Sequence, residues 1–144
     1  MVESSTAQLA GQLVVFSLAD EEYALPIGKV QEIIRYTEPR AVDSGVHWLR
    51  GVISLRGKII PVCDLAARLG LSHEQAETAK IVIVDTQDST AGVIVDDVHE
   101  VLSVTADQLD PVPGQGTDFI QAIAKIDDRL VVLLCPDRML GEVG

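Results

Sequence analysis

Three groups of acidic residues are the first candidates for catalysis in this chain. They are Asp20-Glu21-Glu22, Asp85 with Asp88, and Asp127-Asp128. Paired carboxyl groups could serve as general acid and general base. Each group, however, falls at a predicted hairpin tip, where acidic residues favour turns and solvent. No serine lies in a nucleophile-elbow sequence, and no histidine–aspartate pair can be placed beside one. The chain is therefore predicted not to be an enzyme.

Metal and redox chemistry also lack the necessary spacing. His99 has three acidic neighbours at short range, namely Asp96, Asp97 and Glu100. Because alternate residues of a strand face opposite ways, this group lacks the geometry of a metal site. Cys63 and Cys135 are far apart and form no CxxC motif, so we expect reduced thiols packed as small hydrophobic residues. No metal and no cofactor is predicted.

The composition excludes several further classes of function. The 144 residues are 47% hydrophobic but only 3% aromatic, which indicates one globular domain with an aliphatic core. A net charge of −11 would repel nucleic acids and anionic membrane surfaces. There is no apolar run long enough to span a membrane and no signal peptide, so we expect a cytoplasmic protein without membrane insertion. Residues 1–11 are expected to form a flexible lead-in.

The segment Leu49 to Leu65, LRGVISLRGKIIPVCDL, carries the clearest sign of recognition. It contains two Leu-Arg-Gly triplets, each followed by a β-branched apolar run that suits a strand. Glycine permits a tight turn, so the second triplet is predicted at the tip of a β-hairpin that presents Arg56. Without catalytic residues nearby, a presented arginine indicates binding rather than chemistry.

Short strands joined by turns are predicted along most of the chain. Hairpins are expected at 12–25, 50–63, 81–95 and 119–135, with a further extended segment at 98–104. Pro61 implies that its strand lies at an edge or is bulged. Loops are expected at 41–48 and 105–117. Eight to ten short strands favour closed or nearly closed β-barrels over a βαβ fold.

Three short helices are expected between these strands. Ile27, Val30, Ile33 and Ile34 have helical spacing after Pro26. Asp64 is a predicted N-cap for a helix at 65–69, which Gly70 would end. A last short helix is expected at 136–140, and the polar stretch 72–78 is the best candidate for an internal boundary.

Four segments together resemble the CheW-type family of chemotaxis coupling proteins. They are VVFSLADEEYALPIGKVQE at 14–32, the segment at 49–65, GVIVDDVHEVL within 81–102, and TADQLDPVP at 105–113. The resemblance implies a mostly β fold, with two SH3-like five-stranded β-barrel subdomains sharing a hydrophobic core and a few short helices. It places one domain at 12–140, with a boundary near 70–80, possible exchange of strands between the subdomains, and a tail at 141–144.

The resemblance also implies a non-catalytic adaptor. Such a protein joins the cytoplasmic tips of methyl-accepting chemoreceptors to the regulatory domain of a CheA-type histidine kinase, in arrays at the membrane. The receptor tip is a helical hairpin that the resemblance places in the groove between the two subdomains. An adaptor of a sister pathway, such as surface motility, and a free-standing small-ligand-binding β-barrel remain alternatives.

The matching positions suggest which residues carry the binding. Glu32 and Arg56 match family positions expected to lie close together and form an ion pair beside the receptor site. Val30 and Gly57 are the other expected groove residues. Lys80 and Asp110 are candidates for the kinase interface, although they depart from the apolar and basic residues common at those positions. Ser54 departs likewise from asparagine.

Overall fold

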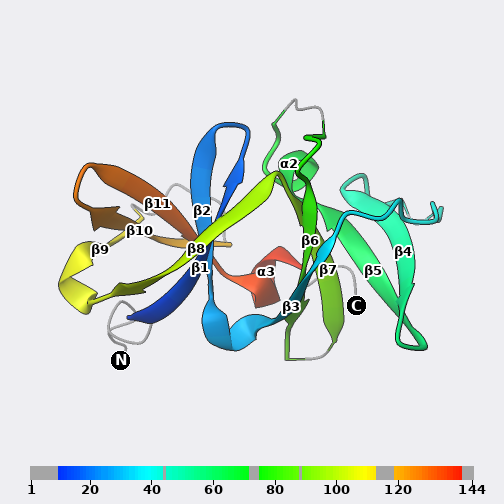
Figure 1. Cartoon of the computed structure of the whole chain (residues 1–144), viewed down its shortest axis with the longest axis horizontal. Coiled ribbons are helices and arrows are strands. Elements are labelled where there is room, and N and C mark those ends of the chain that lie inside the picture. Colours follow the sequence, from blue (N-terminus) through cyan, green and yellow to red (C-terminus); the bar gives the residue numbers. More distant parts are fainter. Residues whose placement is uncertain (1–9, 44, 72–74, 88, 113–118, 141–144) are drawn as a thin grey trace.

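The strands of this protein form two mostly antiparallel β-sheets, which lie side by side with α3 between them (Figure 1). The computed structural model describes residues 10–43, 45–71, 75–87, 89–112 and 119–140. The six-stranded sheet has the order β8-β1-β2-β11-β10-β9, and the five-stranded sheet has the order β3-β6-β7-β5-β4. Residues 1–9 of the expected lead-in and the tail at 141–144 lie outside the described residues.

The strand bounds follow the predicted hairpins closely. The six-stranded sheet contains β1 (Gly11–Leu18), β2 (Glu21–Pro26), β8 (Asp97–Val104), β9 (Leu109–Pro111), β10 (Ile120–Ile126) and β11 (Arg129–Leu134). The five-stranded sheet contains β3 (Val30–Arg35), β4 (Leu49–Leu55), β5 (Lys58–Asp64), β6 (Lys80–Asp85) and β7 (Thr90–Val95). The short helices are η1 (Ile27–Lys29), α2 (Leu65–Arg68), η2 (Ala106–Gln108) and α3 (Pro136–Met139).

The turn between β4 and β5 has the geometry that a two-residue hairpin requires. Arg56 and Gly57 have φ angles of 52° and 81°. Positive φ at both central residues matches the twist of the flanking strands. The predicted hairpin with Arg56 at its tip is confirmed. Asp64 then caps α2 as predicted, because its Oδ1 accepts a hydrogen bond from the Ala67 amide at 3.2 Å.

Several predictions about individual elements were wrong. The helix expected over 27–34 is limited to η1, and the chain then forms β3, which pairs with β6 along its length. The β-branched residues of this segment gain more from sheet pairing than from their helical spacing. One sheet has six strands rather than five, because Leu109–Pro111 in the expected loop 105–117 pairs with β10 as β9. Residues 113–118 of that loop lie outside the described residues.

Pro61 occupies an interior strand without disturbing the sheet. β5 has β4 on one side and β7 on the other, so the alternative of an edge strand was wrong. Val52, which lies opposite Pro61, exchanges both of its backbone hydrogen bonds with Arg40, at 2.8 and 2.9 Å. Pairing with β7 begins only at Val62. The missing proline N–H is therefore needed on neither side.

The chain passes between the two sheets twice. It leaves the six-stranded sheet between β2 and β3 and returns to it between β7 and β8. The segment 70–80, expected as a boundary, lies between α2 and β6, and its residues 72–74 lie outside the described residues. The six-stranded sheet thus combines strands from both ends of the sequence, whereas the five-stranded sheet is formed by the consecutive strands β3 to β7.

The two sheets repeat the same arrangement of strands. In each, a β-hairpin (β1–β2 or β6–β7) pairs in parallel with the last strand of a second hairpin (β10–β11 or β4–β5), and a short helix follows. The bulge between Val30 and Glu32 on β3 recurs on β8, between Val98 and Glu100. The fold is therefore an internal repeat in which each half contributes its first hairpin to the other half's sheet.

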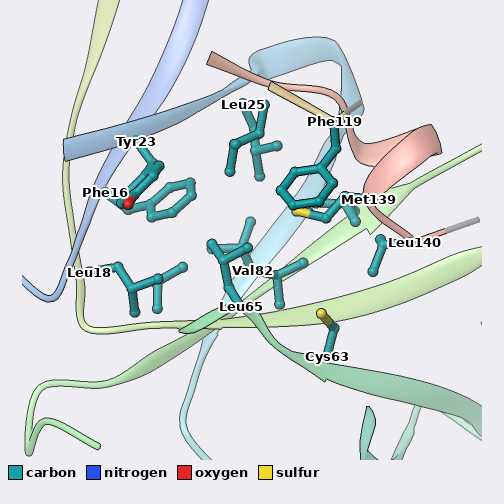
Figure 2. Close-up of a cluster of buried hydrophobic side chains, with 14 of the residues drawn as sticks. Phe16, Leu18, Tyr23, Leu25, Cys63, Leu65, Val82, Phe119, Met139 and Leu140 are labelled. Carbon is teal, nitrogen blue, oxygen red and sulfur yellow. The ribbon is translucent and has the colours of Figure 1, made fainter. Parts of the chain in front are cut away.

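The largest group of buried side chains lies between the sheets. It combines Phe16, Leu25 and Leu134 of one sheet with Cys63 and Val82 of the other (Figure 2). These side chains are all at most 1% exposed. Two smaller aliphatic clusters pack within the individual sheets, one in the six-stranded sheet and one in the five-stranded sheet. Among the described residues, no helix is long and apolar enough to cross a membrane.

Gly51 should be far less replaceable than Gly28. Gly51 has a φ of 150°, and an added Cβ would lie 2.1 Å from the Arg40 carbonyl oxygen. Gly51→Ala should lower the free energy of unfolding by at least about 2 kcal/mol, because backbone rather than a flexible side chain must move. Gly28→Ala, where an added Cβ meets nothing within 4 Å, should change it by less than about 0.5 kcal/mol. Urea unfolding of both variants measures the difference, and equal stabilities would contradict it.

Candidate functional site

Arg56 and Glu32 form a bidentate ion pair across the five-stranded sheet. Arg56 Nη2 donates to Glu32 Oε1 at 2.9 Å, and Nη1 donates to Oε2. Glu32 lies on β3 and Arg56 follows β4, and these are the two edge strands of the sheet. The pair therefore spans the gap between the edges and helps the sheet to close on itself. The expected closeness of the two residues is present in the structure.

This pair leaves the arginine largely open to solvent. The side chain of Arg56 is 68% exposed, whereas that of Glu32 is 23% exposed. The hydrogen bonds from Arg56 hold the pKa of the Glu32 carboxyl below its ordinary value and raise the pKa of Arg56. Glu32 is therefore ionised at neutral pH. An exposed pair contributes little to stability, so its main effect is to hold Arg56 in one orientation.

A shallow hollow of about 100 Å³ lies beside Arg56. Its lining residues all belong to the five-stranded sheet and its turn: Gln31, Leu55, Arg56, Lys58, Ile60 and Thr90. Asp85 organises one wall, since its Oδ1 accepts hydrogen bonds from Gln31 at 2.9 Å and from Thr90 at 3.0 Å. The floor thus offers aliphatic contacts and the rim offers fixed polar groups.

The two other expected groove residues occupy different positions. Gly57 completes the turn next to Arg56. Val30 begins β3 and packs, partly buried, against the core between the sheets. Val30 therefore supports the strand that carries Glu32 and exposes little surface of its own. Ile33 and Ile59, which the sequence did not single out, are 40% and 69% exposed on the same sheet.

A second ion pair on the six-stranded sheet uses the equivalent glutamate with an arginine at a different position, since Arg129 begins β11 as Lys58 begins β5. Glu100 corresponds to Glu32 in the repeat, and its Oε2 lies 2.8 Å from Arg129 Nη2. Arg129 also donates from Nε and Nη2 to the two carboxylate oxygens of Glu22, at 3.0 and 2.9 Å. These bonds lower the pKa of Glu22. Sequence analysis missed this cluster because Glu22 and Arg129 are 107 residues apart.

The two ends of the repeat differ sharply in charge. The turn that carries Arg56-Gly57 on one sheet corresponds to Asp127-Asp128 on the other. Asp127 has a φ of 55°, so both turns bring a charged residue to a hairpin tip. One end of the molecule therefore presents a cation and the other presents two carboxylates.

The structure does not bring the two expected kinase-interface residues together. Lys80 begins β6 of the five-stranded sheet, and its Nζ donates to the Thr78 carbonyl at 2.7 Å and to Asp97 at 3.4 Å. Asp110 lies on β9, at the edge of the six-stranded sheet, and its carboxylate is 2.6 Å from Lys125 Nζ. Each residue is thus held in its own ion pair.

The arginine of the first Leu-Arg-Gly triplet has a structural role. Arg50 donates to Tyr36 Oη at 3.1 Å and to Asp64 Oδ2 at 3.4 Å. Asp64 is also the N-cap of α2. Arg50 therefore connects β4 to the start of this helix. Its spacing from Asp64 could have been noticed in the sequence, but Tyr36 could not.

The residues first considered for chemistry are not arranged as a site. The described residues contain no group of three or more His, Cys, Asp or Glu side chains that could hold a metal ion. Cys63 is 1% exposed, and burial raises the pKa of its thiol well above the ordinary value. A buried thiol of this kind is inert. Asp88, one of the acidic candidates, lies outside the described residues.

Comparison with known proteins decides the family. The CheW-like domain matches residues 12–144. The chain belongs to the CheW family. It is 30% identical to the chemotaxis protein CheW of Klebsiella aerogenes, in an alignment that covers 96% of this chain and 90% of that protein. It is 31% identical to the chemotaxis protein CheW of Thermotoga maritima, over 92% and 89% of the two chains.

A solved structure agrees with the CheW fold of this chain. The crystal structure of the scaffolding protein TtCheW from Thermoanaerobacter tengcongensis superposes with a TM-score of 0.80 at 36% identity, covering 87% of this chain and 88% of that one. The predicted family and the mostly β fold are confirmed. The chain is accordingly a non-catalytic chemotaxis scaffold of the CheW type, which couples receptors to the kinase CheA.

The pKa of Glu32 should depend on Arg56. Arg56→Gln should raise the pKa of the Glu32 carboxyl toward its ordinary value, because it removes the hydrogen bonds that favour the ionised form. NMR titration of the side-chain carboxyl carbons measures this change. Glu22, whose pKa is lowered by Arg129, is the internal control and should titrate as before. A Glu32 titration that ignores the substitution would contradict the assigned pair.

The same shift fixes the sign of the pH dependence. The pKa of Glu32 is lower in the folded chain than in the unfolded chain, so the pair stabilises the fold above the unfolded-state pKa. That contribution is lost as the pH falls through the folded-state pKa. The difference in stability between wild type and Arg56→Gln should therefore shrink in acid.

Proposed function

We propose that the surface around Arg56 docks the cytoplasmic tip of a chemoreceptor. The surface consists of Glu32, Arg56, Gly57 and the hollow beside them, with Val30 supporting β3 from below. The observation that carries the proposal is the exposed guanidinium of Arg56, which the Glu32 carboxylate holds in one orientation. Partners recognise such fixed charges with little loss of side-chain entropy.

The chemistry of this surface suits a helical hairpin. Exposed Ile33 and Ile59 offer apolar contact at 40% and 69% exposure, and Leu55 and Ile60 line the hollow. An amphipathic helix would lay its apolar face there and place an acidic or amide side chain against Arg56. The overall charge of −11 makes Arg56 one of few cations able to attract such a group.

We infer that the regulatory domain of a CheA-type kinase contacts the opposite end of the molecule. There the outer face of the six-stranded sheet carries Leu130, which is 61% exposed and lies opposite Lys125 on β10. Lys125 in turn pairs with Asp110 on β9. An exposed aliphatic side chain beside a fixed ion pair is a common arrangement at binding surfaces. Lys80, on the other sheet, would add a contact at the margin of this interface.

Two partners at opposite ends give the scaffold its role. The receptor tip would bind the five-stranded sheet and the kinase domain the six-stranded sheet. The rigid core between the sheets would then hold the two partners in a fixed relative position. The protein would then work in the cytoplasm, at receptor arrays on the membrane.

Arg56→Glu should weaken binding of a receptor-tip fragment by roughly tenfold or more, because it repels Glu32 and reverses the presented charge. Thermal unfolding and binding of the kinase regulatory domain should stay close to wild type, since Arg56 is largely exposed. Isothermal titration calorimetry with both partners from the same organism measures the effect. The exposed Arg138 on α3 supplies the matched control, as Arg138→Glu.

Wild-type receptor binding and kinase activation by Arg56→Glu would remove Arg56 from the proposed site. Loss of both binding activities together with the fold would likewise argue against a local role. The double variant Arg56→Glu with Glu32→Arg should restore an ion pair between the two positions. It should not restore receptor binding if the partner recognises the positive charge at the turn.

Leu130→Glu should show the opposite selectivity. It places a carboxylate in the exposed aliphatic position of the proposed kinase surface, so binding of the kinase regulatory domain should fall by roughly tenfold. Receptor-tip binding should be unaffected. Ile59→Glu, at the corresponding position of the other sheet, is the matched control and should weaken receptor binding instead. If Leu130→Glu binds the kinase domain like wild type, this face is not the interface.

A further inference from the structure

The guanidinium of Arg68 lies between two buried aromatic rings where the two sheets meet. Its central carbon is 4.8 Å from the centre of the Trp48 ring and 4.6 Å from the centre of the Phe119 ring. Its Nε donates to the backbone oxygen of Met139 at 3.0 Å. Trp48 and Phe119 are only 2% and 1% exposed, so both stacking contacts are shielded from water.

These contacts join the two halves of the molecule. Trp48 directly precedes β4 and Arg68 ends α2, so both belong to the first half of the repeat, which supplies β3, β4 and β5 to the five-stranded sheet. Phe119 directly precedes β10 and Met139 ends α3, in the other half. Figure 2 shows the Phe119 ring beside Met139 at the margin of the core between the sheets. One arginine side chain therefore reaches from one half to two residues of the other.

The internal repeat relates these four residues in two pairs. Trp48 and Phe119 occupy the same position before their hairpins, and Arg68 and Met139 occupy the same last position of their helices. The hydrogen bond thus connects two equivalent residues, which lie 71 positions apart. The geometry of such a contact depends on how one half is rotated against the other.

The apolar core alone does not fix that rotation. It holds the sheets together, but hydrophobic contact is not directional. A cation between two rings and a hydrogen bond to a backbone oxygen both have restricted geometry. Among the described residues no carboxylate pairs with Arg68, so the rings and the Met139 oxygen are the groups that position its guanidinium. Rotation of one sheet would leave a half-buried cation poorly compensated.

We propose that Arg68 is a positioning residue that fixes the relative orientation of the two sheets, and with it the angle between the receptor-facing and kinase-facing surfaces. The functional part of this proposal rests on the function proposed above. Arg68 touches neither partner. It acts by keeping both surfaces in the one arrangement in which a receptor and a kinase can be held together.

The test compares Arg68→Gln with the wild-type full chain. Binding of the receptor-tip fragment alone and of the kinase regulatory domain alone should stay within about twofold, because neither surface contains Arg68. Kinase activation in a mixture of receptor-containing vesicles, full-length kinase and the variant should fall by at least about fivefold, the lower range of coupling between two sites. Arg138→Gln removes an exposed arginine from the other helix and should behave as wild type.

A direct structural readout accompanies the activity. Residual dipolar couplings of backbone amides report the orientation of each sheet separately. In wild type, one alignment tensor should fit both sheets, whereas in Arg68→Gln each sheet should fit well alone and the pair should fit poorly together. Arg68→Lys, which keeps the charge but loses the planar group and the Nε donor, should give an intermediate result and serves if the glutamine variant does not fold.

The outcomes separate the possible roles of Arg68. Unchanged activation or a single alignment tensor in the variants would overturn the proposal. Loss of binding to each partner alone, in proportion to lost stability, would show a merely structural role and overturn it as well. If the wild-type chain binds neither partner, the proposed function fails, while the dipolar couplings still decide whether Arg68 sets the orientation of the sheets.

Discussion

The packing of two sheets against one apolar core is the constraint on which the rest of this structure depends. Because the chain crosses between the sheets twice, the six-stranded sheet combines β1 and β2 with β8 to β11, whereas the five-stranded sheet uses the consecutive strands β3 to β7. The first hairpin of each half completes the sheet of the other half through parallel pairing, of β2 with β11 and of β7 with β5. The six-stranded sheet in addition needs strands from both ends of the chain, and the core between the sheets needs side chains from both sheets.

Polar interactions then determine the shape of each end. The Glu32–Arg56 pair connects the edges of one sheet, whereas on the other sheet the equivalent glutamate, Glu100, pairs with Arg129 on the interior strand β11. The two pairs are used differently. Arg129 is shared between two carboxylates and is half as exposed as Arg56, whereas Arg56 has one partner and remains open. The same framework therefore provides a closed polar cluster at one end and a presented cation at the other.

This divergence within a repeat suits a scaffold with two different partners. A repeat supplies two equivalent surfaces, and the turn residues, Arg56-Gly57 on one and Asp127-Asp128 on the other, give those surfaces opposite charge. Complementary charge selects partners more than it adds affinity. A protein of the CheW family needs such selectivity, because it must hold a receptor and a kinase without exchanging them.

Much of the fold could be predicted from local patterns. The hairpin turns, the Asp64 cap and the strands flanking Arg56 depend on residues close in sequence, and family motifs indicated the overall β architecture. The segment 27–34 was misassigned because its apolar residues fit a helix as well as a strand, and only pairing with β6 decides between them. Pro61 was expected on an edge strand or at a bulge, but β5 is an interior strand. The backbone of Val52, opposite Pro61, bonds to Arg40, so the missing N–H of Pro61 leaves no partner unpaired there.

The sequence by itself determined that the chain folds as a β protein with short strands and that Arg56 lies at a turn. It also showed no recognisable catalytic motif. Those properties follow from short-range backbone preferences and from composition. Only the tertiary structure decided that strands from both ends of the chain share one sheet, that Arg129 binds two carboxylates, and that Arg68 lies between Trp48 and Phe119. Each of these joins residues far apart in the chain, and their contacts depend on how two sheets pack, which no local pattern specifies.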